Sequence, residues 1–210
     1  LATKDALIQH EIPVAENLLI CRRYRDIEQF DYILEQHTSF VIKPNQGSQG
    51  NGIIVIREVL KEFHGITCIS AGGKKWKPSE LKRHIQEILA GTYSQTGLPD
   101  VAYIEPKLEQ ATLLTQIAPG GLSDIRIIVA NGTPVSAMLR MPTEQSFGKA
   151  NLHQGAIGVA IDLRSGQTLR AQHKSKVITM HPDTGASLIG VQIPDWHFIY
   201  EMACRCFQAV

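Results

Sequence analysis

Residues 39–56 constrain the fold of this chain more than any other segment. Residues 40–42 and 53–56 are short runs rich in aromatic and β-branched side chains, which is typical of buried strands. Segment 46–52 between them contains three glycines in seven residues, and Lys43 lies at the end of the first run. Glycines at this density let the backbone approach an anion and point its N–H groups inward. The lysine and the loop together therefore predict a phosphate site.

The order of these features distinguishes among phosphate-binding loops. A P-loop has its lysine after the last glycine and continues into a helix, and a dinucleotide fingerprint also opens a helix. A protein-kinase loop lies between two strands, but its lysine comes later, on the third strand. Lysine first, then a glycine hairpin, then a second strand resembles the ATP-grasp fold, in which a flexible loop covers the nucleotide. An ordinary glycine-rich hairpin with a solvated lysine is the alternative.

Composition is that of an ordinary globular protein. Of the 210 residues, 43% are hydrophobic and 20% charged, and the net charge of +1 favours neither nucleic acid nor an acidic membrane surface as a partner. No apolar run approaches the length that spans a bilayer, and the N-terminal residues lack a signal-peptide pattern. Four scattered cysteines without a C-x-x-C pair are expected to be free thiols. We expect a cytoplasmic protein with no nucleic-acid or membrane partner. The sequence leaves its oligomeric state undetermined.

Hydrophobic periodicity and turn residues predict the remaining elements. Helices are expected over residues 3–10, 26–36, 78–90 and 195–208, with Asp26 and Asp195 as caps. Strands are expected over residues 14–21, 66–70, 101–108, 124–130, 133–141, 156–163, 167–173 and 176–181. The pair around Asn131-Gly132 has the strongest short-range signal for a hairpin. The last helix is expected to pack Phe198, Ile199, Met202 and Phe207.

A soft boundary in residues 94–100 separates a smaller α+β part from a larger, sheet-rich part. We predict an N-terminal helix–strand–helix segment at 1–37, a small subdomain with the glycine-rich loop at 38–98, and a larger sheet subdomain at 99–210. The predicted fold class is α+β and ATP-grasp-like, with two subdomains. A nucleotide cleft is expected between the small α+β part and the larger antiparallel sheet.

Segment 103–108, Tyr-Ile-Glu-Pro-Lys-Leu, resembles the ATP-grasp hinge, where an apolar strand ends in a glutamate and backbone groups meet the adenine edge. Pro106 lacks an N–H but keeps its carbonyl, which is a candidate acceptor from an adenine amino group. The Leu108 N–H is a candidate donor to a ring nitrogen, and Glu109 is a candidate partner for the ribose hydroxyls. A strand end with exposed charges is the alternative.

Arg126 and Arg140 lie among apolar residues on adjacent predicted strands. An arginine on an apolar strand is costly to bury unless it is paired or bound to an anion. A terminal phosphate or an acyl phosphate is a good partner, because the guanidinium fork matches its oxygens. A structural ion pair with Asp124 or Glu144 explains either arginine, taken singly, nearly as well.

Lys149, Asn151 and His153 alternate in the glycine-bounded segment 148–158. An extended chain would place these three side chains on one side. Such a row is a candidate substrate or γ-phosphate surface. A structural role is the alternative for a lone histidine, and three alternating polar groups favour function.

Three motifs together resemble the ATP-grasp ligases related to ribosomal-protein glutamate ligase. They are Asp-Ile-Arg at 124–126, Met-Leu-Arg at 138–140 and Lys-Ala-Asn-Leu-His-Gln-Gly at 149–155. The subgroup that the chain resembles is called alpha-L-glutamate ligase-like, or sugar-transfer-associated ATP-grasp, and the likeness runs over nearly the whole chain. It implies an ATP-dependent carboxylate–amine ligase that acts through an acyl phosphate with ATP and Mg²⁺. The carboxylate and amine substrates stay open, with an amino acid such as glutamate as one candidate.

Carried over residue by residue, this resemblance assigns roles to particular positions. The nucleotide-binding residues that it implies are Lys4, Lys43, Gly47, Ser48, Gln49, Gly50, Asn51, Gly52, Glu105, Pro106, Lys107, Leu108 and Glu109. The catalytic residues that it implies at the reacting end are Arg126, Arg140, Asn151 and His153.

The magnesium ligands of such ligases are an Asp and a Glu-x-Asn that follow a helix like 195–208. Neither motif is present here, so the metal ligands are unknown and are expected beyond Val210 in a longer natural protein. Two other functions stay open: a non-catalytic ATP-binding module of a sugar or cell-surface pathway, and a phosphotransferase acting on a sugar or alcohol.

Overall fold

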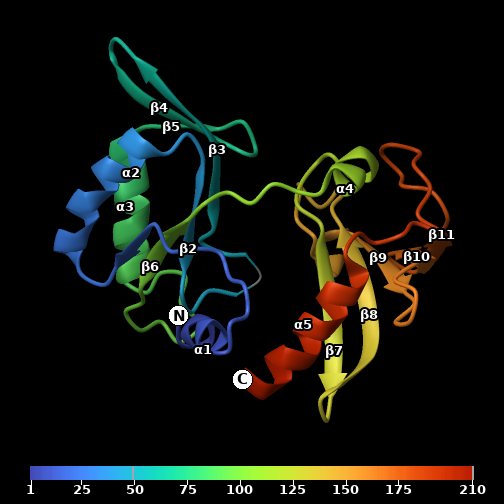
Figure 1. Cartoon of the computed structure of the whole chain (residues 1–210). Helices are drawn as coiled ribbons and strands as arrows, with labels where there is room; N and C mark the ends of the chain where they lie inside the picture. Colours follow the sequence, from blue (N-terminus) through green and yellow to red (C-terminus); the bar gives the residue numbers. More distant parts are fainter. Residues whose placement is uncertain (49, 210) are drawn as a thin grey trace. The chain divides into compact units, whose positions relative to one another are not determined.

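The computed structural model describes residues 1–48 and 50–209. The chain divides into two compact units, Ala15–Leu108 and Leu1–Val14 with Glu109–Val210. Each unit contains one antiparallel sheet and a few helices, so the predicted α+β class is confirmed (Figure 1). We name the first the six-stranded unit and the second the five-stranded unit. The three-part division at residues 37 and 98 stays a prediction.

The six-stranded unit is built on a sheet of strand order β1-β6-β2-β3-β4-β5. Its strands are β1 (Leu19–Cys21), β2 (Phe40–Pro44), β3 (Ile54–Glu62), β4 (Gly65–Ser70), β5 (Lys75–Trp76) and β6 (Ala102–Glu105). A 3-10 turn (Tyr24–Gln29), α2 (Phe30–Gln36) and α3 (Pro78–Leu89) pack on one face (Figure 1). The hairpin predicted around the glycine loop is confirmed, since β2 and β3 pair with Phe40 opposite Ile56.

Helix α3 shows how the sequence pattern fixes packing in this unit. Pro78 opens the helix, and the Glu80 carboxylate accepts the Lys77 N–H at 2.7 Å, as in a capping box. Gly91, with φ +85°, follows its end. Its fully buried apolar positions against the sheet are Leu81, Ile85 and Ile88. Their spacing of three and four residues is the helical period that predicted the element.

The five-stranded unit is built on a sheet of order β11-β10-β9-β8-β7. Its strands are β7 (Asp124–Ala130), β8 (Thr133–Met141), β9 (Ile157–Ile161), β10 (Thr168–His173) and β11 (Lys176–Ile178). Its helices are α1 (Ala2–Gln9), α4 (Thr112–Ile117) and α5 (Trp196–Ala209), with a 3-10 turn at Leu152–Gln154. The predicted β7–β8 hairpin is confirmed, and its turn residues Asn131 and Gly132 both have positive φ, as a type I′ turn requires.

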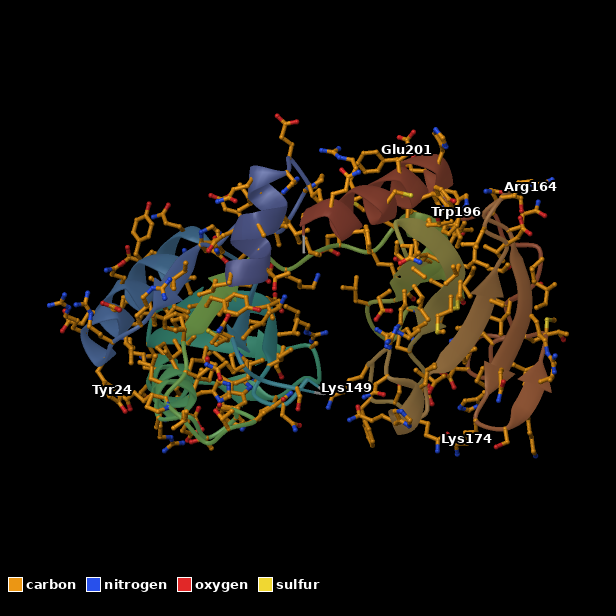
Figure 2. The ribbon with its side chains drawn as sticks, turned by 90° about the horizontal axis from the view of Figure 1, so that it is seen from below. Tyr24, Lys149, Arg164, Lys174, Trp196 and Glu201 are labelled. Carbon is orange, nitrogen blue, oxygen red and sulfur yellow. The ribbon has the colours of Figure 1, made fainter. Side chains whose placement is uncertain are left out.

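Trp196 anchors helix α5 to the five-stranded sheet, which the helix crosses over β7 and β8 (Figure 1). Its indole N–H donates to the Leu163 carbonyl at 3.0 Å, and its side chain is 6% exposed. The ring lies so close over Gly166 that a Cβ there would sit 2.3 Å from it. Figure 2 shows Trp196 near the turn that contains Arg164. The glycine of this turn is therefore required by the tryptophan above it.

The predicted packing of helix α5 is partly wrong. Phe198 and Phe207 are 53% and 48% exposed. The residues of this helix that pack on the core are Trp196, Ile199 and Tyr200. Ile199 and Tyr200 come three and four residues after Trp196, so all three lie on one side of the helix. The aromatic type of Phe198 and Phe207 therefore did not indicate their direction.

Three other sequence predictions differ from the structure. The strand expected at 14–21 begins only at Leu19, because the alanine, glutamate and asparagine before it are poor strand formers. Asp26 is not the cap of a regular helix: it lies inside the 3-10 turn and its carboxylate accepts the N–H groups of Arg22 and Arg23, each at 2.9 Å. The strand expected at 101–108 ends at Glu105, before Pro106, which has no N–H for the ladder.

Across residues 1–48 and 50–209, no helix is both long and apolar enough to cross a lipid bilayer.

Thiol reactivity should divide the cysteines into two classes. Burial raises the pKa of Cys21 to about 12, with a smaller contribution from Asp26, and raises that of Cys68 to about 11. At pH 8 the reactive thiolates of these two should be roughly one in a thousand or fewer. We expect a disulfide reagent to modify Cys204 and Cys206, which are partly exposed, much faster than Cys21 and Cys68.

Raising the pH should speed the reaction of Cys21 and Cys68. Unfolding the protein in urea should make the four cysteines react at similar rates. The double variant Cys204→Ser with Cys206→Ser serves as the control and should lose only the fast phase. Rapid reaction of four thiols in the native protein would contradict the buried positions of Cys21 and Cys68.

Candidate functional site

The glycine loop, residues 45–53, is anchored at its start. The Asn45 N–H donates to the Val101 carbonyl at 2.9 Å, and the Gln46 N–H donates to the Asp100 carboxylate at 2.8 Å. Asp100 is 5% exposed, and its other oxygen accepts the Val101 N–H. A buried carboxylate that accepts backbone N–H groups fixes the chain at the point where it leaves β2.

The end of the loop is anchored to helix α3. The Gly52 carbonyl lies 2.8 Å from His84 Nε2, and His84 Nδ1 lies 3.2 Å from the Tyr93 hydroxyl. Tyr93 in turn donates to Glu87 at 2.8 Å. Burial, with Glu87 adding to it, raises the pKa of Tyr93 to about 12, so this phenol keeps its proton at neutral pH. Both ends of the loop are therefore held by the six-stranded unit.

Lys43 lies beside the loop start and forms an ion pair with Glu105. Lys43 is opposite Tyr103 in the β2–β6 ladder and Glu105 is opposite Val41, so the pair is a diagonal one on the sheet face away from the helices. Glu105 is 5% exposed. Burial, then the charges of Glu105 and Asp100, raise the pKa of Tyr103. Lys43, which is predicted to bind phosphate, and Glu105, which is predicted to lie at the adenine, are thus neighbours.

The other predicted nucleotide-binding residues lie in three places. Pro106, Lys107 and Leu108 follow directly after β6, at the end of the six-stranded unit. Lys4, on α1, and Glu109 belong to the five-stranded unit. The predicted loop residues Gly47, Ser48, Gly50, Asn51 and Gly52 lie together in the hairpin. Gln49 was also predicted to bind nucleotide, and it lies outside the described residues.

Arg126 and Arg140 lie on one face of the five-stranded sheet. Arg126 on β7 is opposite Met138, and Arg140 on β8 is opposite Asp124. Arg140 holds Asp124 through two bonds, Nε at 2.6 Å and Nη2 at 2.9 Å from the carboxylate oxygens. The ion pair with Asp124, one of the two explanations left open by the sequence, is therefore present. Arg126 is exposed on the same face.

Asn151 and His153 do not alternate as the sequence predicts. Residues Leu152–Gln154 form a 3-10 turn, and the Asn151 side chain accepts the His153 N–H at 3.0 Å. Asn151 itself is extended, with φ −99° and ψ 116°, but the chain turns directly after it, so the expected extended row of Lys149, Asn151 and His153 does not form. His153 is exposed at this turn, and the catalytic roles of Asn151 and His153 stay predictions.

Metal ligands are not grouped in the part of the chain that the structure describes: no three His, Cys, Asp or Glu side chains there lie so as to hold an ion. Asp162 follows strand β9, but its Oδ1 accepts the backbone and hydroxyl hydrogens of Ser165 and the Arg164 N–H. These bonds, those of Ser165 first, lower the pKa of Asp162. Its role is to hold a turn, and the described residues do not fit a magnesium site.

The chain matches the family described as sugar-transfer associated ATP-grasp over residues 1–210. It therefore belongs to the sugar-transfer-associated ATP-grasp family, as the sequence motifs predict. No curated protein matches the chain.

Among solved structures, the crystal structure of the D-cycloserine synthetase DcsG is similar, with a TM-score of 0.38 and 12% sequence identity. The match covers 98% of this chain and 66% of that one. This chain thus spans about two thirds of the synthetase's length, and a likeness at this level carries no argument about activity.

Three residues that support the glycine loop were not found from the sequence. Asp100, His84 and Tyr93 are 54, 32 and 41 residues away from their loop partners Gln46 and Gly52. The one available signal was His84, because a histidine among the apolar positions of an amphipathic helix needs a buried partner.

Gly52 should tolerate substitution far less than Gly50. Both have positive φ, +77° and +78°. A Cβ at Gly52 would lie 2.6 Å from Tyr93 Cγ, whereas one at Gly50 would meet no described atom within 4 Å. We expect Gly50→Ala to cost about 1 kcal/mol of unfolding free energy from backbone conformation alone. Gly52→Ala should cost about 1–3 kcal/mol more, because the ring must move.

Urea unfolding followed by circular dichroism measures both variants, with Gly50→Ala as the matched control. Equal losses in the two would show that the contact between Tyr93 and Gly52 does not constrain the loop.

Proposed function

We propose that the six-stranded unit binds ATP at the glycine loop. The observation that carries the proposal is a positive-φ glycine hairpin anchored at both ends, with Lys43 at its start. The N–H groups of Asn45, Gln46, Asn51 and Ile53 are used within the fold. Those of Gly47 and Ser48, between these anchors, are our candidates for phosphate oxygens, and Lys43 neutralises their charge. Family membership supports ATP as the nucleotide.

The reaction that we propose is carboxylate–amine ligation. A carboxylate oxygen attacks the γ-phosphorus of ATP, ADP leaves, and an acyl phosphate forms. An amine then attacks the acyl carbon, phosphate leaves with the bonding electrons, and the nitrogen loses one proton, taken up by phosphate or water, to give the amide. Arg126 and Arg140 are our candidates to stabilise the transferring phosphoryl group, by positioning and charge neutralisation. Magnesium would add charge neutralisation when bound, and no step here is assigned to it because the described residues do not group its ligands.

The remaining parts of the proposal are supported by the motifs rather than by geometry. We propose a relationship to glutamate ligase-like proteins, with an amino acid among the substrates, from the residues at 124–126 and 149–155. A reducing, cytoplasmic location agrees with free thiols at the four cysteine positions.

ATP should stabilise the chain, and this should depend on the Lys43–Glu105 pair. A ligand at 100 times its dissociation constant adds about 2.7 kcal/mol when it binds only the folded state. We expect ATP to raise the melting temperature more than GTP does. The double variant Lys43→Met with Glu105→Gln should abolish most of this rise. Both charges are removed together because Lys43→Ala alone would remove the cation paired with the buried carboxylate of Glu105.

The exposed Lys75 on β5 supplies the control, and Lys75→Ala should keep the full ATP response. A double variant that responds to ATP like the wild-type chain would rule out the phosphate role of Lys43.

The chemical step separates ligation from phosphotransfer. With ATP, magnesium and a carboxylate, an acyl phosphate reacts with hydroxylamine to give a hydroxamate and phosphate. Hydroxamate that appears only when ATP and the acid are both present would support ligation. ADP formation with a sugar or alcohol, without hydroxamate, would instead support the phosphotransferase.

A further inference from the structure

The face of the five-stranded sheet away from its core carries the charged side chains. Strands β8, β9 and β10 alternate, so that Leu139, Val159 and Ala171 pack into the core. The residues between them point the other way. In register they form two rows, Met138–Ala160–Arg170 and Arg140–Gly158–Gln172. We call this surface the arginine face.

A cavity of about 440 Å³ lies over the middle of the arginine face. The cavity forms because Gly158 and Ala160, the central residues of the two rows, have almost no side chain to fill it. Met138 and Arg170 line it on either side. Leu152 overhangs the floor, since a Cβ at Gly158 would lie 3.4 Å from its Cδ2. The cavity volume is in the range of small-molecule sites.

The charges around this cavity favour an anion. Arg170 and Lys174 both line it, whereas none of its described lining residues is a carboxylate. The carboxylate that we identify on the same face, Asp124, is held by two of the nitrogens of Arg140, Nε and Nη2. No ion pair among the described residues includes Arg170 or Lys174. The cavity is therefore positively charged on one side and apolar at Met138 and Leu152.

The position of Lys174 is fixed by its backbone. It lies in the tight turn between β10 and β11 with φ +55°. Residues other than glycine, asparagine and aspartate rarely adopt this backbone conformation. The Gln172 side-chain amide donates to the Lys174 carbonyl at 2.7 Å and holds this turn. The first residue of a two-residue hairpin turn takes a positive φ, so this turn explains the conformation and carries Lys174 at the edge of the cavity.

We propose that this cavity binds a small molecule that carries a carboxylate, with Arg170 and Lys174 as the residues that bind the anion. The guanidinium fork of Arg170 matches two carboxylate oxygens, and Lys174 adds a point charge. The body of the ligand, the size of one amino acid or one sugar acid, lies over Gly158 and Ala160 against Met138. Its identity as the acid substrate of ligation rests on the proposed function.

Amide chemical shifts of the ¹⁵N-labelled chain test the binding without nucleotide. The probes are D-glucuronate and L-glutamate, with glucose as the uncharged match to glucuronate and inorganic phosphate as the other anion. At about 10 mM, where a millimolar site is largely filled, the carboxylates should shift the amides of Gly158, Ala160 and Gln172. Glucose and phosphate should shift them much less.

Two double variants distinguish binding at this site from attraction by the overall charge of the protein. Arg170→Ala with Lys174→Ala should weaken carboxylate binding at least about tenfold, because two charged hydrogen-bond donors are lost. Arg164→Ala with Lys176→Ala removes the same charge from residues that do not line the cavity and should leave binding unchanged. Figure 2 shows Arg164 far from Lys174, at the other end of this unit. Ala160→Ile keeps the charge but fills the floor, and it should also abolish the shifts.

The outcomes distinguish this inference from the proposed function. If neither carboxylate shifts these amides, or if glucose or phosphate shifts them equally, the inference is wrong even when ATP binds. Equal weakening in the two charge variants would also overturn it. If the carboxylates bind here but ATP does not stabilise the chain, the carboxylate site stands and the ligase proposal fails.

Discussion

Each sheet of this protein packs its apolar core against one face only, and the positions of its charged side chains depend on that constraint. An antiparallel strand alternates its side chains, so every strand that contributes to a one-sided core presents its other residues to the opposite face. In the six-stranded unit Ile42 and Ile104 enter the core while Lys43 and Glu105 do not. In the five-stranded unit Leu139 enters the core while Arg140 does not. Burial of the apolar side chains therefore also fixes the sheet face on which the neighbouring charged side chains lie.

The Lys43–Glu105 pair connects the stability of the six-stranded unit to its proposed ligand. A carboxylate as buried as Glu105 is costly unless a cation or hydrogen bonds compensate it. Lys43 supplies that cation, and it is also the cation beside the glycine loop. A phosphate bound there, as we propose, would share Lys43 with Glu105. The same pair is thus a structural contact and, in the proposed function, part of the phosphate site.

Local signals predicted the hairpins of this fold, and long-range contacts explain where prediction failed. Asn131-Gly132 specifies its turn within two residues, and glycine spacing specifies the loop after β2. The bonds that hold that loop come from Asp100 and His84, which no local pattern relates to Gln46 or Gly52. Arg170 is a different case, because it lies between Leu169 and Ala171 on β10, and the signal that singled out Arg126, an arginine among apolar residues on a predicted strand, was therefore present for it as well.

The arginine face shows how neighbouring cations acquire different roles. Arg140 uses two of its five N–H donors on Asp124, so its charge is partly compensated within the fold. Arg170 lies two strands away, beyond a floor of Gly158 and Ala160 whose small side chains offer it no partner. A guanidinium beside an apolar, hollow floor keeps its attraction for anions, because no fixed carboxylate competes for it. Small residues at the centre of the sheet therefore both create the cavity and leave its cation available to a ligand.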